Sequence, residues 1–290
     1  MGTWCAGPAH TAVPLEIVVP ARNEAGRLPA GLRLLCDKLA GLPVRAEVIV
    51  VDNGSTDGTA GIARSWRGPV PVRTIRCDRP GKGAAVRAGL LATRGPWVGF
   101  MDADMATDLA ALDDVLELLR DGRPVVVGSR RHDRSIVQAY ALPFRRLGAV
   151  TFNRLVRDLA GGVADTQCGF KFFAGPLARA AAADLRTAGF SFDVELLAHC
   201  VRRGAEVTAI PVVWRDRPGS TFSVRRHSLR CLIDLALIRA RAGRPQENVR
   251  VPEQPSAPPG EPPGAVAVRE TARETGLPSS SHAAPGFGRG

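Results

Sequence analysis

Four short runs of β-branched and other apolar residues constrain the fold of this chain more than any other feature of its sequence. They lie at residues 15–20, 47–51, 70–76 and 96–101, and helical patterns separate them. Strands that alternate with helices of this length form βαβ units, in which the strands pair in parallel. The sequence therefore predicts an α/β fold with a mostly parallel central sheet flanked by helices.

Polar residues stand at the ends of three of these runs. Asn23 and Glu24 follow the first run, and Asp52 closes the second. Asp102 and Asp104 follow the fourth. Ligands of such sheets bind beyond the carboxyl ends of the strands, so we expect these side chains to meet at one rim.

The two acids after the fourth run are a candidate metal site. Because strand side chains alternate in direction, Asp102 and Asp104, two residues apart, point into the same space. Mg²⁺ commonly takes one or two carboxylates together with substrate phosphates. The motif alone also fits a loop that begins at Asp104 and a helix capped by Asp102.

The second half of the chain continues the alternation of helices and strands. We expect helices at 108–119, 136–159, from about 192 and at 226–241, and strands at 124–128, after the turn at 165–171 and at 205–213. The helix expected at 136–159 is amphipathic and basic, a pattern that fits either a membrane surface or packing on the core.

Composition divides the chain into one folded domain and two terminal segments. The tail at 245–290 is rich in Pro, Gly, Ser and Glu, and we expect it to be disordered. We expect a flexible N-terminus at 1–12. The remaining residues, 13–244, have the length of a single α/β domain.

The positive charge of the chain is concentrated in the second half of this domain. Residues 1–125 hold 15 Lys and Arg against 14 Asp and Glu, whereas residues 126–244 hold 20 against 9. Such a surface indicates a phosphate-bearing partner, an anionic membrane or a nucleic acid. A solvated basic face without a partner also fits this count.

The cysteines and the apolar runs exclude several classes of protein. The six cysteines are scattered and form no Cys-x-x-Cys pair, so they predict free thiols in a reducing compartment. The first residues lack the pattern of a signal peptide. No uncharged apolar run approaches the roughly 20 residues that span a bilayer.

The order of the motifs resembles that of family 2 glycosyltransferases, and more narrowly the dolichyl-phosphate glucosyltransferase and mannosyltransferase branch. The resemblance covers about residues 13–241 and is carried by motifs at 15–24, 51–59, 81–83, 102–104, 128–130, 165–171 and 192–195. It implies a GT-A fold, a Rossmann-like nucleotide-diphospho-sugar transferase domain. Residues 13–105 would form its nucleotide-binding half and 106–244 its acceptor half. The chain departs from the family in two respects. We expect no N-terminal membrane anchor, and Asn53 stands where many relatives carry a second Asp.

The resemblance implies roles at the donor end of the site. The residues expected to contact the donor nucleotide are Pro20, Ala21, Glu24, Asp52, Lys82 and Asp102. Asp102 and Asp104 would hold Mg²⁺ or Mn²⁺ against the diphosphate, so that the leaving nucleotide departs with its charge neutralised. The Gly-Lys-Gly turn at Lys82 lacks the spacing of a P-loop, and a purely structural helix-opening turn is the alternative.

The basic half would hold the acceptor. The residues expected to bind its phosphate are Arg130, Arg145 and Arg146, and those expected near the sugar are Asp165, Gln167, Asp193 and Glu195. A phosphate monoester is mostly a dianion at pH 7, so a general base is dispensable. Asp193 or Glu195 could act as the base for a neutral alcohol acceptor, or stabilise a helix N-terminus. The candidate catalytic residues are Asp102, Asp104, Arg130 and Asp193.

These expectations combine into a metal-dependent, inverting glycosyltransferase. It would move glucose or mannose from UDP-glucose or GDP-mannose to a polyprenyl or dolichyl phosphate. It would be a peripheral protein at the cytoplasmic face of the membrane, with a separate membrane-anchoring partner as a further option. The alternatives are the same donor chemistry with a soluble or glycan acceptor, and a basic nucleic-acid-binding protein. Nucleic acid is disfavoured, because aromatic residues make up 5% of the chain and no helix-turn-helix, zinc or RNA-recognition pattern is present.

Overall fold

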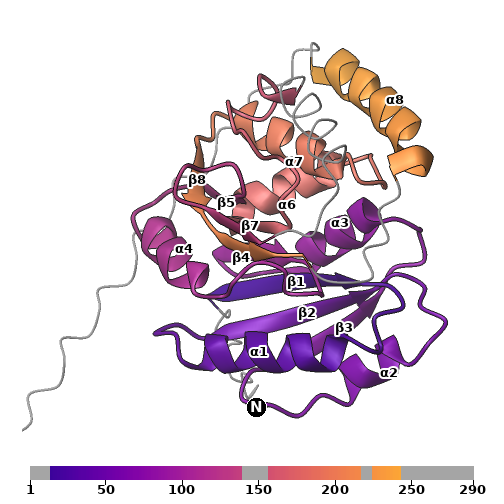
Figure 1. The fold of residues 1–290 in the computed structure, drawn as a ribbon, viewed down its shortest axis with the longest axis vertical. Coiled ribbons are helices and arrows are strands. Elements are labelled where there is room, and N and C mark those ends of the chain that lie inside the picture. The colour runs from indigo at the N-terminus through magenta and orange to yellow at the C-terminus, as the bar shows by residue number, and fades with distance from the viewer. Residues whose placement is uncertain (1–13, 139–155, 217–223, 243–290) are drawn as a thin grey trace, which may run out of the picture. The chain divides into compact units, whose positions relative to one another are not determined.

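The computed structural model describes residues 14–138, 156–216 and 224–242, which belong to one compact unit (Figure 1). The strands of the main sheet are β1 (Leu15–Ala21), β2 (Ala46–Asp52), β3 (Val72–Arg76), β4 (Trp97–Met101), β5 (Val125–Ser129), β7 (Phe170–Ala174) and β8 (Val207–Pro211). The helices are α1 (Leu28–Ala40), α2 (Thr59–Arg64), α3 (Lys82–Ala92), α4 (Ala111–Arg120), α6 (Gly175–Asp184), α7 (Phe192–Val201) and α8 (Val224–Ala242).

The sheet is mostly parallel, as the sequence predicts. Its strand order is β3-β2-β1-β4-β7-β5-β8, and only β7 runs antiparallel to its neighbours β4 and β5. A short parallel pair, β6 (Ile136–Gln138) and β9 (Val213–Arg215), lies apart from the main sheet. Because β7 reverses direction, the segment that precedes it reaches the same rim as the ends of β4 and β5.

Helices cover both faces of the sheet (Figure 1). One apolar cluster joins alternate residues of the strands, such as Ile17 and Val48, to the inner faces of α1 and α4. The intervening residues, such as Val18 and Ile49, join α3, α6 and α7 in a second cluster. This alternation is the period-2 pattern of a strand buried on both faces.

The helix predicted at 136–159 is wrong at its start, and α6 was not predicted. Residues 136–138 form β6, because Ile136 and its neighbours pair with β9. The rest of that segment up to residue 155, with Arg145 and Arg146, lies outside the described residues, as do both predicted terminal segments. The sequence did not predict α6, because its run of alanines has little of the amphipathic pattern that indicates a helix.

None of the helices in the described part of the chain has the length and apolar character needed to cross a bilayer.

Candidate active site

The carboxyl ends of β1, β2 and β4 meet at one rim, which brings the predicted polar residues together. Ala21 is in register with Asp52, and Val18 of β1 is in register with Phe100 of β4. The turn after β1 is tied to the loop after β2. Asn23 adopts a positive φ of 54°, its amide donates to Ser55 Oγ at 3.0 Å, and its side-chain oxygen accepts the Thr56 amide at 2.9 Å.

Three acids at this rim act on one another electrostatically. Burial raises the pKa of the Asp104 carboxyl, and the neighbouring charge of Asp102 raises it further. Burial also raises the pKa of Glu24, and the charges of Asp104 and Asp102 add to this shift. Arg27 binds Glu24 at 2.8 Å and opposes the shift. The rim therefore concentrates negative charge that a cation would stabilise.

The two carboxylates after β4 are held by short backbone contacts. Oδ1 of Asp104 accepts the Ala106 amide at 3.1 Å, and the Asp102 amide donates to the Gly169 carbonyl at 3.1 Å. A Cβ on residue 169 would lie 2.0 Å from Asp102 Oδ2, so a residue other than glycine there would displace that carboxylate. The segment before β7 thus forms one wall of the acidic site.

This geometry fits a divalent cation. Lys82 Nζ already lies 2.5 Å from Asp102 Oδ1, so one carboxylate of the pair attracts a positive group. The described residues contain no cluster of three or more His, Cys, Asp or Glu that could hold a metal. Asp102 and Asp104 could hold an ion that takes one or two carboxylates and completes its shell with phosphate oxygens and water.

Lys82 projects from a turn whose two glycines are needed for close packing. Gly81 has a φ of +121°, and a Cβ there would lie 2.2 Å from the Ala188 carbonyl oxygen. A Cβ on Gly83 would lie 2.5 Å from both Phe192 Cβ and the Thr187 carbonyl oxygen. The Gly-Lys-Gly motif is thus the place where the loop before α7 meets the start of α3.

Asn53, the departure from the family pattern, organises the loop that leads to this turn. Its side-chain nitrogen donates to the carbonyls of Cys77 at 3.0 Å and Arg79 at 2.8 Å, and its oxygen accepts the Gly81 amide at 2.8 Å. The side chain is 5% exposed. A carboxylate accepts hydrogen bonds but donates none, so aspartate could not make the first two contacts.

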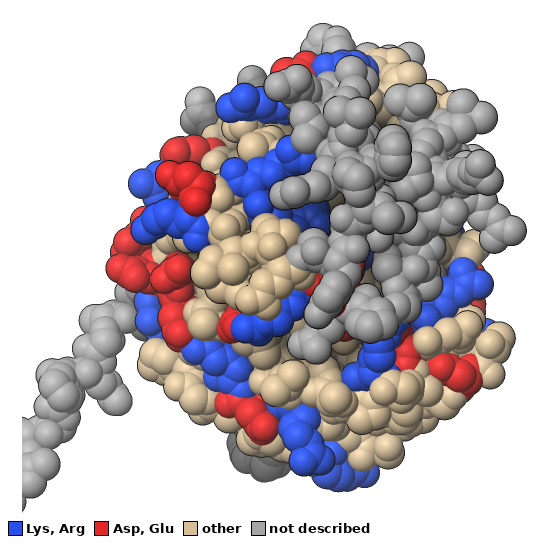
Figure 2. All heavy atoms as spheres, viewed as in Figure 1, with Lys and Arg blue, Asp and Glu red and all other residues tan. Residues whose placement is uncertain are grey.

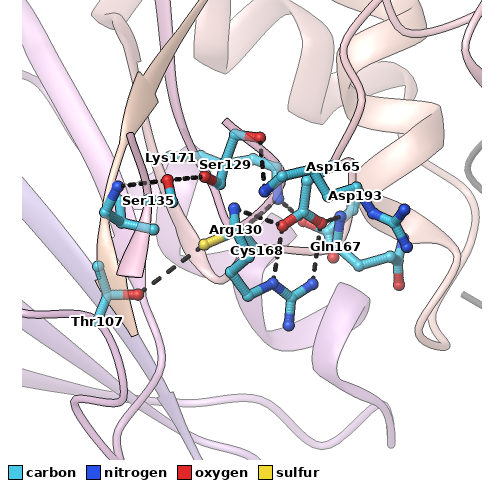
Figure 3. A network of polar contacts seen from close by, with 11 residues as sticks. Thr107, Ser129, Arg130, Ser135, Asp165, Gln167, Cys168, Lys171 and Asp193 are labelled. Atoms are coloured by element: carbon cyan, nitrogen blue, oxygen red, sulfur yellow. Dashed lines mark hydrogen bonds and ion pairs between the residues drawn. The ribbon is translucent and has the colours of Figure 1, made fainter. Parts of the chain in front are cut away.

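Arg130, predicted to bind the acceptor phosphate, is paired with Asp165 (Figure 3). Its Nε and Nη2 donate to the two oxygens of Asp165 at 2.7 and 2.9 Å, and the guanidinium lies 5.4 Å from the Trp214 ring centroid. Burial alone would raise the pKa of Asp165, but Arg130 outweighs it and lowers that pKa. The pair joins the end of β5 to the segment before β7.

Asp193 is paired with a lysine to which the sequence analysis gave no role. Lys171 is fully buried, and its Nζ donates to Asp193 Oδ1 at 2.6 Å and to the Cys168 carbonyl at 2.5 Å (Figure 3). Burial raises the pKa of Asp193 despite the nearby ammonium groups of Lys171 and Lys82. The signal available in the sequence was Lys171 itself, inside the 165–171 motif and in a strand that is otherwise apolar.

The remaining predicted residues divide into two groups. Gln167 lies beside the Arg130 pair, where its backbone N–H donates to Asp165 Oδ1 at 3.2 Å. Glu195, predicted near the sugar, instead binds the backbone of the loop before α7, with the Thr187 amide at 2.7 Å. The structure thus brings the donor-side residues together and ties the acceptor-side acids to internal cations and amides.

The chain matches known proteins over most of this domain. The family model described as "Glycosyl transferase family 2" matches residues 16–174. The chain belongs to glycosyl transferase family 2.

This family 2 glycosyltransferase is similar to enzymes named dolichyl-phosphate beta-glucosyltransferase. It is 32% identical to the one from Dictyostelium discoideum over 78% of this chain and 74% of the relative. It is 34% identical to the one from Homo sapiens over 78% of this chain and 75% of the relative. The resemblance noted from the motifs is therefore confirmed for both the family and the branch.

The fold is that of solved GT-A enzymes. Glucosyl-3-phosphoglycerate synthase from Mycobacterium tuberculosis, crystallised with Mn²⁺, UDP and its product, superposes with a TM-score of 0.59. It is 20% identical, and the match covers 84% of this chain and 88% of that chain. At this identity the likeness shows the fold, and it confirms the predicted α/β architecture.

Substituting Asn53 with aspartate should destabilise the glycosyltransferase. In Asn53→Asp, a carboxylate would face the carbonyls of Cys77 and Arg79, and we expect the free energy of unfolding to fall by about 1–3 kcal/mol. Urea denaturation followed by circular dichroism measures this change. Asp78→Asn, at an exposed position in the same loop, serves as the control and should leave the midpoint unchanged, and an equal loss in both variants would contradict the assignment.

Breaking the Lys171–Asp193 pair should cost more than removing both charges. Lys171→Met leaves a buried carboxylate without its partner, and we expect a loss of about 3–5 kcal/mol. The double variant Lys171→Met, Asp193→Leu should recover a large part of that loss. Thermal and urea unfolding measure the stability of the two variants. A double variant less stable than Lys171→Met would contradict this account.

Proposed function

We propose that this family 2 glycosyltransferase transfers a hexose from a nucleotide diphosphate sugar to a polyprenyl phosphate. The observation that carries the proposal is the pair Asp102 and Asp104 beside Lys82, at the rim where Asp52 ends β2. The similarity to dolichyl-phosphate beta-glucosyltransferases supports glucose as the sugar and dolichyl phosphate as the acceptor. A UDP-bound structural neighbour supports UDP as the nucleotide.

At the donor end, carboxylates of this chain would bind the nucleotide base and the metal ion, and one lysine would bind the phosphates. Asp52 is 6% exposed and has acceptor oxygens suited to the N–H of a uracil ring, with Pro20, Ala21 and Glu24 beside it. Asp102 and Asp104 would hold Mg²⁺ or Mn²⁺, which neutralises the leaving diphosphate when bound. Lys82 lies close enough to Asp102 to reach the same phosphates.

At the acceptor end, Arg130 remains suited to a phosphate although it is paired with Asp165. A guanidinium carries five N–H donors, and the pair uses two of them. Burial would lower the pKa of Arg130, but Asp165 raises it, so the group stays charged. A fixed guanidinium orients a phosphate dianion for in-line attack on the anomeric carbon, which inverts that carbon in one displacement.

The rival function keeps the donor chemistry and changes the acceptor. The structural neighbours include enzymes named for phosphoglycerate, a small soluble acid. An exposed apolar stripe on α8 favours the lipid acceptor instead. Ile233, Ala236, Leu237 and Ala240 occupy one outer face of that helix, and Ile233 and Leu237 are 48% and 46% exposed.

This stripe suits an anionic membrane surface. The opposite face of α8 buries Leu235 and Ile238 against α7, so the outer face is left to another partner. The helix lies at the margin of the molecule, beyond α7 (Figure 1). Lys and Arg side chains are visible over much of the face drawn in Figure 2. In the sequence, residues 126–244 hold 20 basic residues against 9 acidic ones. Apolar anchoring combined with basic charge is the pattern of interfacial helices.

Donor choice and metal dependence can be tested together. With Mn²⁺ present, radiolabelled UDP-glucose should yield labelled lipid on a short polyprenyl phosphate, and GDP-mannose should yield less. Asp104→Asn should lower kcat/KM by about 100-fold or more, since the leaving group loses its charge stabilisation. Asp114→Asn, an exposed acid on α4, should keep wild-type activity. Transfer by Asp104→Asn at the wild-type rate, or transfer only to water-soluble acids, would refute the proposal.

The membrane surface has its own test. In flotation with phosphatidylglycerol vesicles, Ile233→Glu with Leu237→Glu should reduce bound protein by about tenfold, because apolar burial is replaced by charge repulsion. Leu34→Glu, at a position 52% exposed on α1, is the matched control and should float like the wild type. Equal loss in both would show that the stripe on α8 is not the contact. Activity on detergent-dissolved acceptor should persist in the double variant.

A further inference from the structure

Glu195 is a nearly buried carboxylate that faces the protein interior. It lies in the first turn of α7, and its side chain is 3% exposed. Its Oε2 accepts the Thr187 amide at 2.7 Å and the Arg186 amide at 3.2 Å. These amides belong to the loop between α6 and α7, so Glu195 fixes the backbone of that loop.

The other carboxylate oxygen of Glu195 faces a guanidinium and an imidazole. Arg241 Nη1 of α8 lies 3.3 Å from Oε1, and His199 Nε2 lies 3.9 Å from the same atom. Burial by itself would raise the pKa of Glu195, but His199 and the hydroxyl and amide of Thr187 outweigh it and lower that pKa to about 2. These contacts favour the ionised form of Glu195 and make it a weak general base.

The loop that Glu195 holds lies against the start of α3. The carbonyl of Ala188, one residue beyond Thr187, accepts the Gly83 amide at 2.9 Å and the Ala84 amide at 3.4 Å. These are among the first amides of α3, which have no partner inside their own helix. The absence of side chains at Gly81 and Gly83 is what lets the loop approach so closely.

Lys82 stands between those two glycines, so the loop also sets its position. Its Nζ lies 2.5 Å from Asp102 Oδ1 and 5.9 Å from the ring centroid of Phe192, the first residue of α7. One continuous set of contacts therefore runs from α8 through Glu195, the loop and the Lys82 turn to the acidic site.

We infer that Glu195 is a positioning residue for the donor: it anchors the Thr187–Ala188 backbone that seats the Gly81–Gly83 turn and aims Lys82 at Asp102. The inference deepens the proposed function and rests on it for the nature of the ligand. It replaces the role near the sugar that the motif predicted for Glu195. The same contacts explain the Gly-Lys-Gly motif. Its glycines allow the Thr187–Ala188 backbone to approach closely, and its lysine would then bind the donor.

A double-mutant cycle separates positioning from general structural support. The probe is UDP with MnCl₂, and the dissociation constant is measured by calorimetry on the full chain. Lys82→Met should weaken binding about tenfold, and Glu195→Gln about three- to tenfold, since a neutral amide holds the loop less firmly than a charged carboxylate. The double variant should bind as Lys82→Met does, because Glu195 acts through Lys82. Effects that multiply would overturn the inference.

Hydrogen exchange tests the same contacts without any ligand. Glu195→Gln, and more strongly Glu195→Ala, should speed exchange of the Gly83 and Ala84 amides. Arg239→Gln is the matched control, because Arg239 lies on the same helix as Arg241 but pairs with Asp158 at 2.8 Å. It should change neither exchange nor UDP binding. Unchanged exchange in both Glu195 variants would overturn the inference, whereas a wild type that binds no UDP with Mn²⁺ would overturn the proposed function instead.

Discussion

The insertion of β7, antiparallel, between β4 and β5 is the constraint on which the site depends. It carries the segment 165–169 to the rim at which β4 and β5 end. Asp165 can then bind Arg130 after β5, and Gly169 can pair with Asp102 after β4. Because of this reversal, one segment contacts both the acidic end of the site after β4 and Arg130 after β5.

Charge balance explains why so many ionised groups tolerate burial here. Lys171 and Asp193 would each be costly alone in the interior, and their contact at 2.6 Å, with a further bond to the Cys168 carbonyl, offsets that cost. The cost of burying the Asp165 carboxylate is offset in the same way by its contact with Arg130. Asp102 and Asp104 lie close together beside Lys82, and the charge of Asp102 raises the pKa of Asp104, so this part of the rim suits a divalent cation.

The sequence predicted the mostly parallel sheet and the meeting of its polar strand ends, because both depend on local pattern. A continuous apolar run such as 48–51 is typical of a strand buried on both faces, and the positions of Asp52 and Asp102 follow from where the strands end. The acceptor side was less predictable, since the partners of Asp193 and Glu195 come from Lys171 and from loop amides distant in sequence. Motif order placed these acids near the site, but only the tertiary fold determines which way a carboxylate faces.

Asn53 illustrates how a departure from a family pattern can carry information of its own. An aspartate at position 53 could not donate to the carbonyls of Cys77 and Arg79, whereas the amide of Asn53 joins both carbonyls to the Gly81 amide. Asn53 binds the Gly81 amide, and the Ala188 carbonyl binds the amides of Gly83 and Ala84, so both loops contact the turn that carries Lys82. The amide of Asn53, which follows β2, and the carboxylate of Glu195 in α7 thus support the same turn. Rigid support of this kind from two elements is what precise placement of a charged group at a reacting phosphate requires.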